Sequence, residues 1–148
     1  MSTIRLIPKP NPIVITAQLG ASSVITPAFL NNTGNTINEG AFVYVDDSEE
    51  LQLAVATSEL TGAGVGFVAA DVPHGASASL KVSGLSQYQL EDGAPGASPG
   101  DLLFLSATDP GKLSTSPPEV AAGRVVVQVG SHMSDQVLIN IRIMTAYT

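Results

Sequence analysis

Glycine and proline recur along the whole chain and separate short runs of apolar and β-branched residues. The 148 residues include 14 glycines and 10 prolines. Glycine accepts positive φ and proline cannot donate a backbone hydrogen bond, so both residues end strands and form tight turns. No window shows a convincing helical period. The pattern predicts an all-β fold with little helix, either a compact antiparallel β-barrel or a β-sandwich.

Alternation of apolar and polar residues identifies the strands most clearly in two segments. Leu80 and Val82 alternate with polar residues over 79–83, and the branched residues of 137–143 alternate with Asn140 and Arg142. A period of two is typical of half-buried strands. Further strands are predicted at 13–16, 24–30, 41–45, 51–56, 65–69, 102–106 and 124–129.

A weak internal repeat links two parts of the chain. Residues 39–45 match 99–105, which places Gly100 60 residues after Gly40. The same offset aligns three further pairs: Leu53 with Leu113, Val65 with Val125, and Phe67 with Val127. Each copy then predicts a glycine turn followed by three strands. A true duplication and convergent hairpin patterns both account for such a match.

The length suits one domain with an arm. A chain of 148 residues buries one substantial core but is too short for two independent ones. We expect residues 21–148 to form a single all-β domain, with a pseudo-repeat over 38–82 and 98–143. The tetrapeptide Asp-Pro-Gly-Lys at 109–112 has the composition of a tight turn inside the second copy.

The first 20 residues differ in kind from the rest. Prolines at alternate positions cannot pair in a sheet, so this segment is predicted to be an extended arm. Such arms reach neighbouring molecules in assemblies, and a disordered terminus is the alternative. The candidate partner-binding residues of the arm are Ile7, Pro8, Pro10, Pro12, Ile13 and Ile15.

The chain is acidic but carries few charges. Its net charge is −7, and only 13% of its residues are charged, against about 25% in an average domain. Six basic residues spread over the chain make no cluster that would bind nucleic acid. The low charge favours an obligate oligomer or lattice component, with a charge-poor monomer as the alternative. No segment is long and apolar enough for a secretory signal or a membrane helix.

The sequence offers little for catalysis, metals or cofactors. There is no cysteine, and His74 and His132 lie in turn-like contexts without metal-ligand spacing, which predicts surface loop histidines. The glycines of 62–66 lack the Lys-Ser/Thr of a phosphate-binding loop and favour close backbone packing. The four acidic residues of 46–50 lack a calcium-loop pattern, so we interpret them as a solvated hairpin tip. We expect no enzyme, no cofactor and no metal site.

Two stretches resemble segments of small phage structural proteins. The runs SPGDLLFLS at 98–106, PGKLST at 110–115, PP at 117–118 and VQVG at 127–130 resemble a segment recurrent in these proteins. The run NEGAFVY at 38–44 resembles a hairpin of phage capsid decoration (cement) proteins and related head proteins. These motifs mark turns and strand cores, so the resemblance assigns no functional residue.

The resemblance implies a barrel of β-tulip or SH3-like hairpins, trimeric and seated on the capsid exterior. It implies a virion structural protein that binds the outer surface of a phage capsid and bridges major capsid subunits. Its partners would be the major capsid protein and its own homotrimer, with neither nucleic acid nor membrane, and it would be made in the host cytoplasm. Similar runs occur in tail fibres, so a tail-fibre or head-fibre adhesion module is the alternative. A third candidate, a trimeric enzyme of the dUTPase type, lacks its catalytic Asp and Tyr motifs here.

Overall fold

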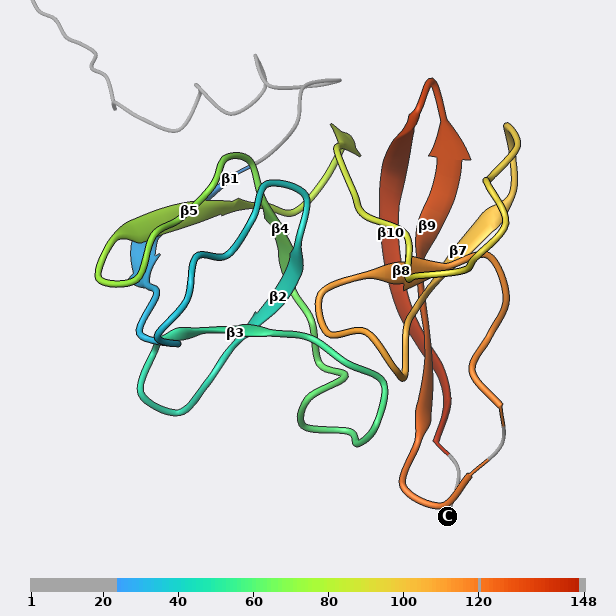
Figure 1. Cartoon of the computed structure of the whole chain (residues 1–148), viewed down its shortest axis with the longest axis horizontal. Helices are drawn as coiled ribbons and strands as arrows, with labels where there is room; N and C mark the ends of the chain where they lie inside the picture. Colours follow the sequence, from blue (N-terminus) through green and yellow to red (C-terminus); the bar gives the residue numbers. More distant parts are fainter. Residues whose placement is uncertain (1–23, 120, 147–148) are drawn as a thin grey trace, which may run out of the picture.

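The protein consists of two five-stranded sheets, as a computed structural model shows for residues 24–119 and 121–146. Every strand pair is antiparallel, and the described residues contain no helix. The two sheets lie side by side, with the early strands in one and the late strands in the other (Figure 1). This confirms the all-β prediction, although neither sheet closes into a barrel.

The two sheets have the same topology. The first contains β1 (Val24–Leu30), β2 (Phe42–Val45), β3 (Leu51–Leu53), β4 (Gly66–Val68) and β5 (Ser77–Lys81), in the order β1-β5-β4-β2-β3. The second contains β6 (Leu85–Ser86), β7 (Leu102–Leu105), β8 (Leu113–Ser114), β9 (Val125–Met133) and β10 (Gln136–Ala146), in the order β6-β10-β9-β7-β8. Each strand of the first sheet therefore corresponds to the strand that comes five strands later, so that β1 corresponds to β6 and β5 to β10. We call residues 24–81 the first half and residues 85–146 the second half.

The register of pairing is also the same in both halves. In the first sheet one row of directly paired residues runs Val24, Lys81, Phe67, Phe42. In the second sheet the corresponding row runs Leu85, Leu138, Ser131, Leu102. Since directly paired residues share a face of the sheet, Phe42 corresponds to Leu102 and Lys81 corresponds to Leu138.

Two glycines occupy the same place in the two halves. A Cβ on Gly66 would lie 2.6 Å from the carbonyl oxygen of Lys81, and a Cβ on Gly130 would lie 2.1 Å from that of Leu138. Both glycines let the neighbouring strand approach more closely than any side chain allows. This shared contact is a second, independent sign that the halves correspond residue by residue.

The offset of 60 residues predicted from the sequence holds only for β2 and β7. Val45 pairs with Leu51, and the corresponding Leu105 pairs with Leu113, so Leu113 matches Leu51 and the predicted match with Leu53 is wrong. The hairpin loop is 46–50 in one half and 106–112 in the other, which shifts the alignment by two residues. A further shift precedes β9, so the predicted pairs of Val65 with Val125 and Phe67 with Val127 are also wrong.

The halves meet in an apolar core. The first half has its own cluster: Ile37, Ala41, Val43, Leu51, Val68, Val72 and Leu80. The larger cluster combines residues of the second half with four residues of the first half: Phe42, Ala54, Ala56 and Phe67. Backbone hydrogen bonds cross the same junction, since Phe42 N donates to Gly111 O at 2.9 Å and Gly111 N donates to Ala54 O at 2.7 Å.

Most predicted strands are present, with small differences in their bounds. The segment 24–30 is β1, and the other predicted strands differ by a few residues from β2, β3, β4, β5, β7, β9 and β10. The two-residue strand β6 was not predicted, and the two-residue strand β8 was implied only by the internal repeat, which aligned Leu113 with a strand residue of the first copy. The predicted strand at 13–16, and the whole arm of residues 1–20, lie outside the described residues.

Candidate functional site

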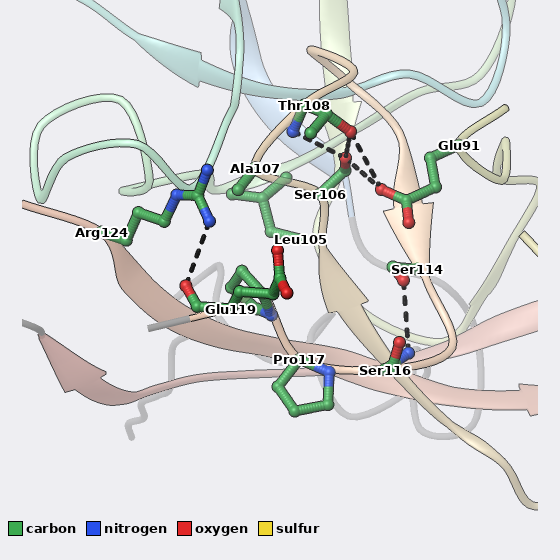
Figure 2. Close-up of a pocket in the computed structure, with 11 residues that line it drawn as sticks. Glu91, Leu105, Ser106, Ala107, Thr108, Ser114, Ser116, Pro117, Glu119 and Arg124 are labelled. Carbon is green, nitrogen blue, oxygen red and sulfur yellow. Dashed lines mark hydrogen bonds between the residues drawn. The ribbon is translucent and has the colours of Figure 1, made fainter. Parts of the chain in front are cut away.

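A polar cavity of about 200 Å³ opens beside the β7–β8 hairpin (Figure 2). Its polar lining consists of Glu91, Ser106, Thr108, Ser114, Ser116, Glu119 and Arg124. Glu91 comes from the segment before β7, Ser106 follows β7, and Arg124 precedes β9. The cavity thus gathers hydroxyl, carboxylate and guanidinium groups from separate parts of the second half.

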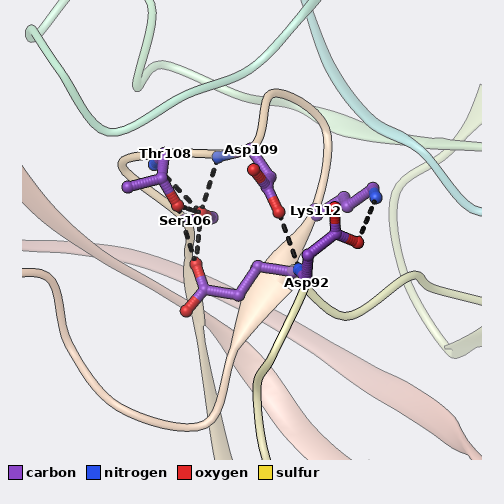
Figure 3. Close-up of polar contacts among 6 residues, drawn as sticks. Asp92, Ser106, Thr108, Asp109 and Lys112 are labelled. Carbon is purple, nitrogen blue, oxygen red and sulfur yellow. Dashed lines mark hydrogen bonds and ion pairs between the residues drawn. The ribbon is translucent and has the colours of Figure 1, made fainter.

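The Ser106 hydroxyl is the central polar group of this cavity, and hydrogen bonds engage it fully. Its Oγ donates to the Glu91 carboxylate and accepts from the backbone N–H groups of Thr108, at 3.1 Å, and Asp109, at 3.0 Å. A nucleophilic serine needs a base that removes its proton while its oxygen attacks the reacting atom. Here the Ser106 hydroxyl instead accepts two backbone hydrogen bonds and stabilises a turn. Figure 3 shows these contacts beside Asp92, whose N–H donates to Asp109 and whose carboxylate meets Lys112 Nζ at 3.2 Å.

The corresponding position in the first half is Asp46, and it has the same role. Asp46 Oδ1 accepts from the N–H groups of Ser48, at 2.9 Å, and Glu50, at 3.0 Å. Gln52 Nε2 donates to Asp46 Oδ2 at 2.8 Å. Hydrogen bonds from Gln52 and from the backbone lower the pKa of Asp46. Both halves therefore use one polar side chain to fix the hairpin loop, and the Ser106 cluster is structural.

The acidic residues of 46–50 form a hairpin tip, in agreement with the interpretation from the sequence. The Asp46 carboxylate accepts hydrogen bonds from the loop backbone, while Asp47 and Glu49 are exposed. Among the residues that the structure describes, no group of three or more His, Cys, Asp or Glu side chains could hold a metal ion.

The two histidines differ from each other. His74 lies in an exposed loop, where its Nδ1 accepts from Gly34 N at 3.0 Å. The surface-loop prediction is wrong for His132, which lies in β9 and is only 7% exposed. The strand continues past Gly130 because residues 130–133 pair with β10, a pairing that the turn-like local sequence does not reveal.

His132 contacts a partly buried tyrosine, Tyr88. The Tyr88 hydroxyl and His132 Nδ1 are 2.8 Å apart, and His132 Nε2 lies 3.9 Å from Asp135 Oδ1. Burial raises the pKa of the Tyr88 phenol, and the charges of Asp135 and Asp101 raise it further. The hydrogen bond between the two side chains gives each of them a partner, so this pair stabilises the second half.

The glycines of 62–66 serve close packing, as predicted. A Cβ on Gly64 would lie 2.1 Å from the Phe42 ring, and one on Gly62 would lie 2.5 Å from Val125 Cγ2. The segment is a loop leading into β4. Its glycines allow the loop to lie against both halves, which explains the Gly-x-Gly pattern without a ligand.

Among the residues whose side chains the structure describes, exposed large apolar ones concentrate on the second sheet. The exposed large hydrophobic residues on β7, β9 and β10 are Leu102, Met133, Leu138, Ile143 and Met144, whereas the first half contributes Leu60 and Val65. We call Leu102, Ser131, Met133 and Leu138 the outer face of the second sheet, because pairing and alternation place them on one side. Sequence reasoning missed this face. The apolar residues on both sides of β10 were the available signal.

The predicted partner-binding residues Ile7, Pro8, Pro10, Pro12, Ile13 and Ile15 lie outside the described residues. Their role in binding stays a prediction.

Comparison of the chain with protein-family models, with curated proteins and with solved structures gives no match. In the described part of the chain, no helix has the length and apolar character needed to cross a membrane.

Proposed function

We propose that this protein is a non-enzymatic structural component of a phage particle, a decoration protein that binds the outer surface of the capsid. The observation that carries the proposal is the outer face of the second sheet, an exposed apolar surface on a chain with few charges. Such surfaces on small proteins mark sites of association. The polar groups of the cavity support the same view, because their hydrogen bonds hold loops.

The proposed mechanism is mechanical. Packaged DNA presses outward on a capsid, and a subunit that bridges neighbouring coat proteins adds interface area across the seams between them. Each contact can be modest, because an oligomer that engages several seams gains from multivalency. The arm of residues 1–20 would act as a clasp on the coat protein, and the acidic hairpin tip would face solvent.

The test is binding to coat-protein shells. The purified full chain is mixed with expanded empty shells, and bound protein is measured by co-sedimentation together with the thermal transition of the shells. The proposal expects saturable binding and a higher transition temperature. A chain that stays in the supernatant and leaves the transition unchanged would overturn it. Binding to host cells in place of shells would favour the fibre module.

A further inference from the structure

The two halves use corresponding faces differently. In the first sheet, the face that bears Phe42 and Phe67 is covered, and both side chains are 0% exposed. Their rings contact each other with centroids 4.9 Å apart. In the second sheet, Leu102 stands at the position of Phe42 and is 47% exposed.

The second half helps to cover the face of the first sheet. Phe42 and Phe67 belong to the same apolar cluster as Leu105 and Val127 of the second half. Gly111 O of the β7–β8 loop accepts a hydrogen bond from Phe42 N at 2.9 Å. In the first sheet, therefore, the face that corresponds to the outer face of the second sheet is one on which another half docks.

The corresponding face of the second sheet has no such cover among the described residues. Leu102, Met133 and Leu138 are 47%, 44% and 39% exposed. Leu102 and Leu138 flank Ser131 in one row, and Met133 lies two residues along β9 on the same side. The result is an apolar surface across three adjacent strands, β7, β9 and β10.

We propose that a second copy of this chain docks on the outer face of the second sheet. Within one chain, the corresponding face of the first sheet is covered by apolar residues of the second half such as Leu105 and Val127. These residues are buried in every copy, so the second copy docks through its own outer face, which is exposed in the same way. This inference rests on the proposed function, which places the protein in a virion. It adds to that function the surface through which decoration subunits contact each other.

The charges around the face predict how salt affects this contact. Asp101 and Asp135 are exposed next to the face, and each copy has a net charge of −7. Docking two copies brings like charges together, which salt screens. Self-association therefore becomes tighter as the salt concentration rises, whereas a contact held by ion pairs becomes weaker.

The test is the mass of the full chain over a concentration series, measured by sedimentation velocity at low and high salt. The key variant is Leu138→Lys, because Lys81 occupies the corresponding position in the first sheet and shows that this fold accepts lysine there. The matched control is Leu60→Lys, which changes an exposed leucine in a loop of the first half. Unfolding curves of both variants establish that they fold.

We expect the wild type to form a species of a multiple of 15.1 kDa, and Leu138→Lys to weaken self-association at least about tenfold, equivalent to about 1.4 kcal/mol. Leu60→Lys should match the wild type. A wild type that stays at the monomer mass at every concentration would overturn the inference. So would unchanged association in both Leu138→Lys and Leu102→Lys.

Shell binding separates this inference from the proposed function. A chain that self-associates through the face but ignores coat-protein shells supports the inference and overturns the proposed function. A wild type that binds shells as a monomer does the reverse. If the wild type is such a monomer, loss of shell binding in Leu138→Lys would assign the face to the coat protein.

Discussion

Replacement of Gly130 by alanine tests a close approach between β9 and β10. The added Cβ would lie 2.1 Å from the carbonyl oxygen of Leu138, 2.8 Å from Val137 Cγ2 and 3.0 Å from the carbonyl carbon of Leu138. Real Cβ atoms essentially never come within 3.0 Å of another heavy atom. Because the obstructing oxygen belongs to the backbone of β10, relief requires the strands to separate by about 0.9 Å, the difference between 3.0 and 2.1 Å.

Strand separation stretches the hydrogen bonds between β9 and β10, which form the longest strand pair among the described residues. Overpacking costs typically about 1–3 kcal/mol, and each weakened hydrogen bond adds about 1 kcal/mol. In the opposite direction, alanine restricts the unfolded chain more than glycine does, which raises the free energy of unfolding by about 0.4–1 kcal/mol. We therefore expect Gly130→Ala to lower the free energy of unfolding by about 3 kcal/mol. Gly66→Ala, whose Cβ lies 2.6 Å from the carbonyl oxygen of Lys81, should cost less, about 1–2 kcal/mol.

The assay is urea unfolding of the full chain, with thermal unfolding as a second measurement. A loss of about 3 kcal/mol lowers the melting temperature of a domain of this size by about 6–12 °C. The control is Gly96→Ala, because no heavy atom lies within 4 Å of its added Cβ and its φ is not positive. A Gly130→Ala protein as stable as Gly96→Ala would refute the reasoning.

Three further predictions concern Asp46 in the hairpin loop, the partly buried Tyr88 and the arm. The folded-state pKa of Asp46 is lowered, so the stability it contributes is present above its unfolded pKa and is lost as pH falls through the folded value. Asp46→Ser should keep the turn, because Ser106 holds the corresponding turn in the other half. The variant should lack this acid-dependent loss of stability in melting curves measured from pH 2 to 7. A variant with the same pH profile as the wild type would contradict this prediction. The pKa of Tyr88 is raised, so its contribution is complete below about pH 10 and is lost above it. Tyr88→Phe should cost about 1–2 kcal/mol at pH 7, because His132 loses its partner, and should abolish the alkaline loss; urea unfolding at pH 7 and 10.5 measures both, and equal stability at pH 7 would refute it. Deletion of residues 1–12 should weaken shell binding without changing the unfolding curve, and unchanged binding would disprove the clasp.

The sequence predicts the strands well where local chemistry determines them. β1 (Val24–Leu30) matches its predicted bounds because the sequence there is apolar and β-branched. The turn at 109–112 is present, with Gly111 at φ 81° and a hydrogen bond from Lys112 N to Asp109 O. Local composition carries no information on β6 and β8, two-residue strands that exist only because β10 and β7 are beside them.

Properties that depend on distant pairing could not be predicted from local patterns. His132 is buried because β9 continues beside β10, although its neighbours in sequence resemble a turn. The correspondence between the halves is clear in the pairing register and weak in the sequence, since loops of different length change the offset between strands. The outer face also depends on this register, because only strand pairing places Leu102 beside Ser131 and Ser131 beside Leu138.

The short link between the halves determines how the contact between them responds to dilution of the protein. Residues 82–84 join β5 to β6, so the halves face each other at the high effective concentration of a short tether, of millimolar order. Their contact is therefore independent of how much protein is present. A contact between separate chains has no tether, so its extent rises with protein concentration, and it is most complete where many copies are held close together, as on the surface of a crowded particle.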